Sequence, residues 1–356
     1  APARFGAAQG TSGRDGNAGF NIRGLEGNRV LTLVDGVRIP DGFEFGAQAA
    51  GRGDYVDLGL LKSVEILRGP ASALYGSDGL AGVVSFVTTD PEDLLGNKDW
   101  GLLARTGYAS ADEEWNGTAV ASGRVGAVSA MVALTVRRGH ELDNQGTNDA
   151  PNATRTRPNP QDTRSDSVLG KLVWDVGAGH RLRLTAEHLD DQVDTNVLSG
   201  VAPVPTLPTS VVGLRAEDRI QRSRFSLDWR YSGEGLVESA QLTGHWQEAK
   251  NRQATFEDRR TAADRSRINT FDNRVWGFAG DVTLGFETGV SRHQLVTGAD
   301  VVFTRQDGLR DGTVPTPPDV FPTRAFPTTD FTLAGLFIGD EIRFGDGRFI
   351  LFPALR

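Results

Sequence analysis

The chain has 356 residues, a formal net charge of −8 and no cysteine. The lack of cysteine excludes disulfides, thiolate metal sites and cysteine nucleophiles, and the negative charge argues against wholesale nucleic-acid binding. The longest apolar stretch, near residues 79–87, is far shorter than the ~20 residues of a membrane-spanning helix. These features exclude a helical membrane protein, but they allow a β-barrel, whose strands alternate apolar and polar residues.

Residues 1–97 are expected to form a compact α+β domain. Short apolar strands are predicted at residues 29–35 and 63–67, separated by glycine-rich turns. Asp35-Gly36 ends the first of these strands and is typical of a tight turn. Residues 71–75 follow a proline, which is favoured at the start of a helix, so one helical turn is predicted there.

From residue 98 to residue 356 the chain changes to segments in which apolar and polar residues alternate, and this period of two indicates β-strands. Trp276, Phe278 and Leu284 share one face of such a strand, whereas Asp281 and Thr283 share the other. The sequence predicts eleven of these strands, at residues 100–110, 113–123, 124–139, 164–177, 179–192, 217–232, 236–251, 267–286, 291–306, 329–344 and 348–356.

The predicted connections alternate between short and long along most of this region. Short turns on one rim and long loops on the other are typical of a bacterial outer-membrane barrel. Compact soluble domains rarely carry several long structureless loops, so a soluble all-β protein with long insertions is the weaker alternative. The short connections lie near residues 122–125, 177–179, 232–235, 288–291 and 345–347, and the long ones near residues 140–163, 193–216, 251–266 and 307–328.

Residues 17–97 resemble the plug domain of TonB-dependent outer-membrane receptors. Three segments carry the resemblance: Asn21-Ile-Arg-Gly-Leu25, Arg29-Val-Leu-Thr-Leu-Val-Asp-Gly-Val37, and Val64-Glu-Ile-Leu-Arg-Gly-Pro-Ala-Ser-Ala-Leu-Tyr-Gly76 with its continuation to Phe86. The third segment is long enough that a chance match is implausible, unlike a lone short motif.

The resemblance implies an N-terminal α+β plug domain inside an antiparallel transmembrane β-barrel. The family's barrel has 22 strands, of which about 11 are present here, and the domains are expected at residues 1–97 and 98–356. It also implies a multi-pass receptor in the outer membrane of a Gram-negative bacterium, energised by the inner-membrane TonB complex. Membrane lipid and lipopolysaccharide are the expected surroundings, nucleic acid is not an expected partner, and the chain is not expected to be an enzyme.

The segments Gly51-Arg-Gly-Asp-Tyr-Val-Asp-Leu-Gly59 and Gly76-Ser-Asp-Gly-Leu-Ala-Gly82 are most similar to the haem and haemoglobin receptor branch. The resemblance therefore implies uptake of haem, free or from haemoproteins, as a transported ligand rather than a prosthetic group. Ferric-siderophore and cobalamin receptors share most of the plug sequence and form the alternative. A soluble β-type binding or adhesion module is the alternative from another functional class.

The ends of the chain differ from the family's pattern. No apolar leader segment is visible in residues 1–19, the TonB box that precedes the plug is not found, and the family's final aromatic-ended strand is missing. We therefore expect a chain that is truncated at both ends, with the remaining barrel strands supplied by residues outside this sequence. Half a barrel alone would leave unpaired strand edges in lipid, which is strongly disfavoured.

Three plug residues are predicted to lock the plug to the barrel. Arg23 and Arg68 lie in the Ile-Arg-Gly and Leu-Arg-Gly-Pro segments, where the resemblance implies arginines that face carboxylates of the barrel wall. Glu65 is predicted to join that network. The alternative is that these are ordinary solvated side chains, and the wall carboxylates are expected beyond Arg356.

The predicted ligand-facing plug loop runs from Ile39 to Tyr55. A haem site needs aromatic walls, a cation for the propionates and an axial donor. Phe43 and Phe45 could stack on the macrocycle, Arg52 could meet a propionate and Tyr55 could ligate the iron. For each of these residues, packing that anchors the loop is the alternative.

Haem receptors of this branch often use a plug histidine as an axial ligand, but residues 1–97 contain no histidine. Only His140, at the start of the first long loop, is expected on the ligand side of the barrel. It is the candidate metal ligand, and a hydrogen bond at the rim is the favoured alternative.

Overall fold

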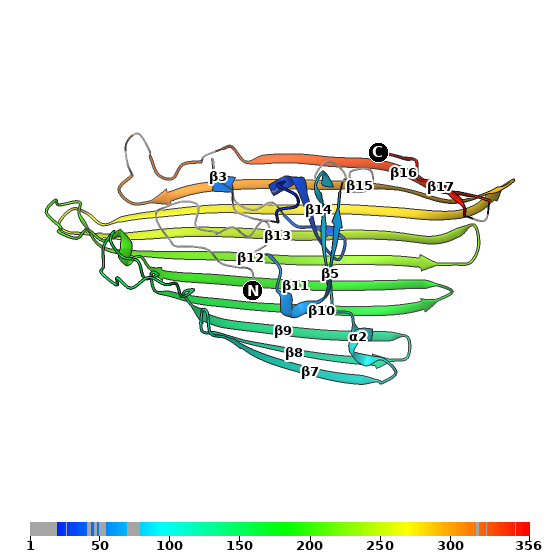
Figure 1. The fold of residues 1–356 in the computed structure, drawn as a ribbon, viewed down its shortest axis with the longest axis horizontal. Coiled ribbons are helices and arrows are strands. Elements are labelled where there is room, and N and C mark those ends of the chain that lie inside the picture. Colours follow the sequence, from blue (N-terminus) through cyan, green and yellow to red (C-terminus); the bar gives the residue numbers. More distant parts are fainter. Residues whose placement is uncertain are drawn as a thin grey trace.

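The computed structural model describes residues 20–25, 27–40, 44–45, 48–49, 55–69, 79–315, 317, 320–324, 326–345 and 347–356. A small mixed sheet lies across a much larger antiparallel sheet of long, nearly parallel-running ribbons (Figure 1). We call the small sheet, with the segments around it, the plug and the large sheet the wall. The helical turn predicted at residues 71–75 lies outside the described residues.

The plug sheet has the strand order β2-β1-β6-β5. β1 pairs in parallel with β6 and antiparallel with β2, and all five residues of β1 are buried. Asp35 and Gly36 join β1 to β2 with φ angles of 51° and 83°, as a tight hairpin turn requires. The plug elements are η1 (Gly27–Arg29), β1 (Val30–Val34), β2 (Val37–Arg38), β3 (Glu44–Phe45), β4 (Gln48–Ala49), η3 (Leu58–Leu60), β5 (Leu61–Arg68), β6 (Gly82–Thr88) and α2 (Pro91–Leu95).

The wall is one sheet in which every strand pairs antiparallel with its sequence neighbour, from β7 at one edge to β17 at the other. The eleventh predicted strand is divided into β17 and β18, which both pair with β16. The sheet does not close on itself. Its strands are β7 (Trp100–Ala109), β8 (Glu114–Val125), β9 (Val128–His140), β10 (Gln161–Gly177), β11 (His180–Asn196), β12 (Val211–Ser232), β13 (Val237–Arg259), β14 (Arg265–Thr288), β15 (Ser291–Gly312), β16 (Thr329–Phe344), β17 (Phe349–Leu351) and β18 (Ala354–Leu355); η5 (Leu198–Gly200) lies between β11 and β12.

The alternation along the wall strands is confirmed. Trp276 and Phe278 are each 52% exposed on the outward face of β14, whereas Val275, which precedes Trp276, is buried toward the plug. Along β9, buried and exposed residues alternate for most of the strand. The wall therefore has an apolar outward face and a mixed, largely polar inward face that the plug covers in part.

The long connections of the sequence prediction are confirmed at residues 141–160, 197–210 and 313–328, but the one at residues 251–266 is wrong. There β13 continues to Arg259 and β14 begins at Arg265, so the connection is only residues 260–264. The strands stay paired to the end of this hairpin because Glu257 lies opposite Arg265 and the two side chains form an ion pair.

The outward face carries aromatic residues near both limits of an apolar band. Near the short turn between β14 and β15, the rings of Phe286 and His293 stack at 4.9 Å. Ten residues earlier in β14, toward the long connections, Trp276 lies opposite Phe303. Ten residues at ~3.3 Å each, on strands tilted by about 40°, correspond to roughly 25 Å of height, which is the apolar thickness of an outer-membrane barrel. Within the part of the chain that the structure describes, no helix is both long enough and apolar enough to cross a membrane.

Gly82 is predicted to be required for the pairing of β5 with β6. A Cβ atom at this position would lie 2.2 Å from the backbone oxygen of Leu67, so Gly82→Ala must push the two strands apart. Gly36→Ala is the matched control, because a Cβ there has open space and only the positive φ costs energy, about 1–2 kcal/mol. Hydrogen–deuterium exchange should show a large loss of protection in β5 and β6 for Gly82→Ala only; equal effects of both variants would contradict the prediction.

Candidate functional site

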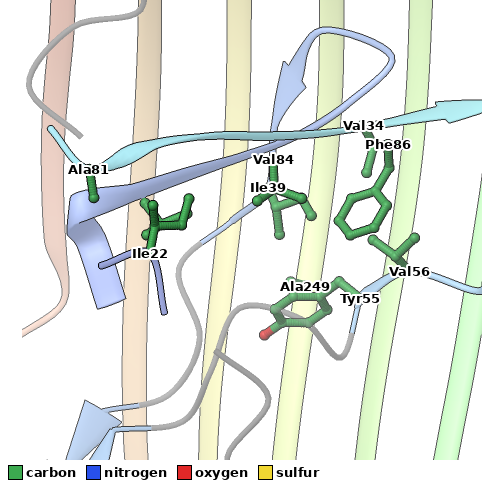
Figure 2. Close-up of a cluster of buried hydrophobic side chains, with 10 residues drawn as sticks. Ile22, Val34, Ile39, Tyr55, Val56, Ala81, Val84, Phe86 and Ala249 are labelled. Atoms are coloured by element: carbon green, nitrogen blue, oxygen red, sulfur yellow. The ribbon is translucent and has the colours of Figure 1, made fainter. Parts of the chain in front are cut away.

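The plug contacts the wall through an apolar cluster at the centre of the inward face. Figure 2 shows Val34, Phe86 and Tyr55 gathered over Ala249, which comes from β13 of the wall. Ala249 is 1% exposed, and its small side chain lets the Tyr55 ring approach the wall closely. Ile220 of β12 packs at the edge of the same cluster. This contact brings the end of β1 to the wall, where the ionic contacts begin.

Arg224 of β12 is the centre of a buried ionic network between wall and plug. Its side chain is fully buried and donates to Asp35 Oδ2 and to the backbone oxygen of Val34, both at 2.9 Å. On the wall side it donates to Glu187 Oε2 at 2.9 Å, and Arg222 donates to the same oxygen at 2.9 Å. Asp35 ends β1, so Arg224 holds both the side chain and the backbone of the β1–β2 turn.

Lys171 of β10 extends the network to a second plug carboxylate. Its fully buried ammonium lies 2.8 Å from Asp90 Oδ1 and 3.8 Å from Asp35 Oδ2. Arg183 of β11 donates to Asp90 at 3.4 Å and to Asp228 of the wall at 3.2 Å. Asp90 is held for this contact because it caps α2 within a capping box. Ionic groups of β10, β11 and β12, beside Ala249 of β13, therefore form part of one set of wall contacts that we call the seat of the plug.

A third plug carboxylate, Asp57, meets the wall at β9. Arg137 donates to both oxygens of Asp57, at 3.0 and 3.3 Å, and to Glu114 of β8 at 3.1 Å. Asp57 also accepts a hydrogen bond from Gly59 and so fixes the start of η3. A Cβ on Gly59 would lie 2.7 Å from the Thr118 hydroxyl, so glycine allows the close approach of plug and wall here.

The two main plug carboxyls are held ionised by the wall. Burial by itself raises the pKa of Asp35, but the charges of Arg224 and Lys171 outweigh it and hold that pKa far below its usual range. The pKa of Asp90 is lowered in the same way, mainly by Lys171 and then by Arg183, against the effect of burial. Both carboxyls therefore carry their charge at any physiological pH.

The charges in this network are the reverse of those in the lock predicted from the sequence, which paired plug arginines with wall carboxylates. Here the plug supplies carboxylates and the wall supplies cations. Arg23, Glu65 and Arg68 are exposed, and no described residue forms an ion pair with them. The structure does not bring these three residues to a wall carboxylate, so their predicted role stays a prediction.

Sequence reasoning did not identify Asp35, Asp90, Lys171 or Arg224 as contact residues. Asp35 was assigned only to a tight turn. The wall cations were interpreted only as polar residues in strands that alternate apolar and polar positions. One usable signal was Lys171, a charged residue that shares the inward side of β10 with Leu169 and Val173.

Of the four ligand residues predicted in the plug loop, only Tyr55 has a described side chain. Phe43 and Arg52 lie outside the described residues, and for Phe45 the structure describes only the backbone, in β3 (Figure 1). Tyr55 is 2% exposed and packs in the apolar cluster, while its backbone oxygen accepts a 2.6 Å hydrogen bond from Arg222. Iron ligation by the Tyr55 hydroxyl would require this cluster to open.

Four arginines that we call the mouth cluster, Arg259, Arg265, Arg267 and Arg310, gather where β13, β14 and β15 approach the long connections. Arg267 is close enough to the other three arginines for their positive charges to repel its own. Glu257 accepts hydrogen bonds from Arg259, at 3.2 Å, and from Arg265. From the sequence, Arg259, Arg265 and Arg310 were placed in the predicted long connections at residues 251–266 and 307–328, and Arg267 at the start of a predicted strand.

Aromatic side chains border the mouth cluster. The guanidinium of Arg267 lies 5.6 Å from the centre of the Phe321 ring. Phe326, from the same long connection, meets the ring of Phe271 edge-on at 6.1 Å. Cationic and aromatic groups side by side suit a ligand that is both anionic and planar.

His140 lies where β9 enters the first long connection. Its Nδ1 is 3.6 Å from Asp162 directly across the strand pair, and both side chains are more than half exposed. In the part of the chain described here, no group of three or more His, Cys, Asp or Glu side chains could hold a metal ion. A contact at the rim is the geometry observed, and iron ligation by His140 stays a prediction.

Comparison with known proteins places both regions in one family. Residues 5–83 match the TonB-dependent receptor plug domain, and residues 174–356 match the TonB-dependent receptor-like β-barrel. Hemoglobin-binding protein A of Haemophilus influenzae is 30% identical over 264 residues, which cover 69% of this chain and 26% of that protein. Transferrin-binding protein A of Neisseria meningitidis serogroup B is 35% identical over 141 residues, which cover 36% of this chain and 15% of that protein.

Among solved structures, the ferric preacinetobactin receptor BauA of Acinetobacter baumannii has a similar fold. The TM-score is 0.65 at 17% identity, and the match covers 98% of this chain and 52% of that one. The chain thus spans about half the length of this structure and about a quarter or less of the two curated relatives. The structural match supports the arrangement of plug and wall described above.

Arg224→Gln is predicted to loosen the plug. The substitution leaves Asp35 and Glu187 buried without their shared cation, which costs about 3–5 kcal/mol for a buried pair. The matched control is Arg219→Gln, because Arg219 forms a two-point contact with Asp190 on the exposed outward face, where the loss should stay below about 1 kcal/mol. Hydrogen–deuterium exchange of β1 amides measures the difference; equal protection in both variants would refute a central role for Arg224.

Acidification is predicted to release the plug only well below neutral pH. Asp35 and Asp90 bind protons less readily in the folded plug than when unfolded, so their stabilisation is fully present above about pH 4 and is lost as pH falls toward the lowered folded-state values. Exchange protection of β1 should stay constant between pH 7 and pH 5, after correction for the intrinsic exchange rate. Release within that range would contradict the assignment, and Asp35→Asn should weaken protection at every pH.

Proposed function

Because the chain belongs to the family of TonB-dependent outer-membrane receptors, we propose that it is the plug, residues 1–97, and part of the barrel, residues 98–356, of a receptor for the active uptake of an iron-containing ligand. We propose haem, free or taken from a haemoprotein, as that ligand. The proposed energy source is the inner-membrane TonB complex, acting on the plug.

The seat of the plug is the observation that carries the transport function. Three plug carboxylates, those of Asp35, Asp57 and Asp90, meet the cations of four wall strands. Such ion pairs are strong while water is excluded from them. When the plug is displaced, the charged groups can form hydrogen bonds with water in place of the ion pairs. A plug that is held in this way closes the passage at rest and can leave its seat under a directed force.

Haem is favoured over the alternatives by the hemoglobin-binding relative, which shares 30% identity over most of this chain. Another relative is named as a transferrin-binding protein, over a shorter match. Ferric-siderophore receptors match in fold at an identity that supports no ligand assignment. A ferric-siderophore or cobalamin receptor with the same mechanism is the second candidate.

The mouth cluster supports a ligand with anionic groups on an aromatic body. Haem carries two propionates on a flat apolar macrocycle, so guanidinium groups beside Phe321 and Phe326 match both parts of it. The cluster faces the long connections, which in outer-membrane barrels lie outside the cell. A ligand that arrives from outside would meet these arginines before it meets the plug.

Haem binding is predicted to depend on the mouth cluster. Titration of the purified receptor with haemin should shift the Soret band, and Arg267→Gln with Arg310→Gln should weaken binding at least tenfold through loss of the propionate contacts. Arg292→Gln is the matched control, an exposed arginine at the short-turn end of β15. Separate Tyr55→Phe and His140→Ala variants test the two predicted axial ligands through the shape of the spectrum.

The alternative ligand gives a distinct result. No Soret shift, together with tight binding of a ferric siderophore, would replace haem by a siderophore and leave the transport mechanism in place. Failure of both ligands in a protein whose plug stays protected from exchange would remove the proposed ligand class altogether.

A further inference from the structure

His245 lies on the inward face of β13 beside the seat of the plug. It is 9% exposed, and neither of its ring nitrogens has a hydrogen-bond partner among the described residues. Two residues later on the same face, Gln247 donates to the backbone oxygen of Arg38 at 2.6 Å, so this part of the wall lies beneath the plug. Burial of polar nitrogens without partners costs free energy, which an apolar residue would avoid. The stability of the closed molecule therefore does not explain a histidine here.

The wall provides a recess for the ring of His245. Gly277 of β14 lies directly opposite, and a Cβ atom there would lie 2.1 Å from Cε1 of the imidazole. The ring thus lies across Gly277, in space that the side chain of any other residue would fill. Rotation about the Cα–Cβ bond of His245 to another staggered position would carry the ring nitrogens away from the wall and into the passage, once the plug no longer covers them.

Two arginines of the seat, Arg222 and Arg224, lie close to this recess. Both are near enough to His245 for their charges to act on its ring. Arg224 is directly opposite Gln247 and is therefore the diagonal neighbour of His245, at a distance of about 7–8 Å for such pairs. The nearest carboxylate, Asp228, already accepts hydrogen bonds from a guanidinium at 3.2 Å and a threonine hydroxyl at 2.7 Å.

Both arginines lose a plug partner when the plug is displaced. In the closed molecule, Arg224 pairs with Asp35, and Arg222 donates to the backbone oxygen of Tyr55 at 2.6 Å. Glu187 of the wall stays with both of them, at 2.9 Å from each. Two guanidinium groups then share one carboxylate, which leaves one net positive charge beside His245 for an anionic ligand.

We propose that His245, Arg222 and Arg224 form a transit site for haem inside the passage, assembled when the plug is displaced. An imidazole nitrogen of His245 ligates the iron, and the guanidinium groups bind the propionates through charge-assisted hydrogen bonds. Val275 and Ala249, which are buried on the same inward face, supply apolar surface for the macrocycle. The inference rests on the proposed function for the identity of the ligand, but the site is separate from the mouth cluster.

The first test asks whether the plug controls access to His245. It compares the purified receptor with the variant D35N/D90N, which removes the two main plug carboxylates and keeps every wall cation. Carbethoxylation of His245 by diethyl pyrocarbonate, read by mass spectrometry, should be at least tenfold faster in the variant, and saturating haemin should restore protection. A ring that stays unreactive in D35N/D90N, or that haemin does not protect, would overturn the proposal.

The second test is a haemin titration followed by absorption spectroscopy. D35N/D90N should bind one more haem than the wild type, with the spectrum of an imidazole-ligated iron. Addition of H245Q should remove that spectrum and weaken the second haem at least tenfold. The matched control is H188Q, because His188 lies on the outward face and bonds to Ser223 at 2.9 Å, and it should change neither. Iron-free protoporphyrin should bind D35N/D90N equally with and without H245Q, because only the iron needs the imidazole.

Three outcomes of the titration would overturn the proposal: no second haem in D35N/D90N, a second haem that is unchanged by H245Q, or an equal loss of protoporphyrin in H245Q, which would give His245 a structural role only. In each case the first haem at the mouth cluster would persist and show that the wall is folded, so the proposed function would stand. Absence of haem binding in every variant and in the wild type would remove both proposals.

Discussion

The position of the plug depends on the neutralisation of Arg224 in the interior of the molecule. A guanidinium with no exposed surface costs several kcal/mol in lost hydration, and only the combination of Asp35, Glu187 and the Val34 oxygen offsets that cost. The apolar cluster over Ala249 is non-directional and would tolerate small shifts of the plug sheet. The ionic contacts do not tolerate such shifts, so they select one position among the many that the apolar contact allows.

This constraint explains why the carboxylates lie where the plug backbone is itself held firmly. Asp35 follows a fully buried strand, Asp57 caps η3, and Asp90 caps α2. Each acid therefore reaches the wall from a fixed point and pays little additional ordering entropy. The wall cations, in contrast, project from the middle of long strands whose neighbours fix their direction on both sides.

The arrangement of strands could be predicted from the sequence because alternation reports which face of a strand meets lipid, and the plug could be identified from its motifs. The ionic seat could not. Asp35 and Arg224 are 189 positions apart, and their meeting depends on the register of every strand pair between β7 and β12. The error at residues 251–266 has a related cause, since strands that continue beyond the membrane lose their apolar face and read as loops. The mouth cluster was missed for the same reason.

The distribution of charge in the seat, with cations on the wall and carboxylates on the plug, has a consequence for the charge of the ligand in the proposed transport. In the transport mechanism proposed above, displacement of the acidic plug would leave Lys171, Arg183 and Arg224 facing water along one side of the passage, each without its plug counterion. A surface of fixed cations in a confined channel behaves like an ion-exchange resin: it concentrates anions and repels cations. The passage would thus be selective for negatively charged ligands at the moment it opens. When the plug returns, its carboxylates would displace the ligand from the wall cations.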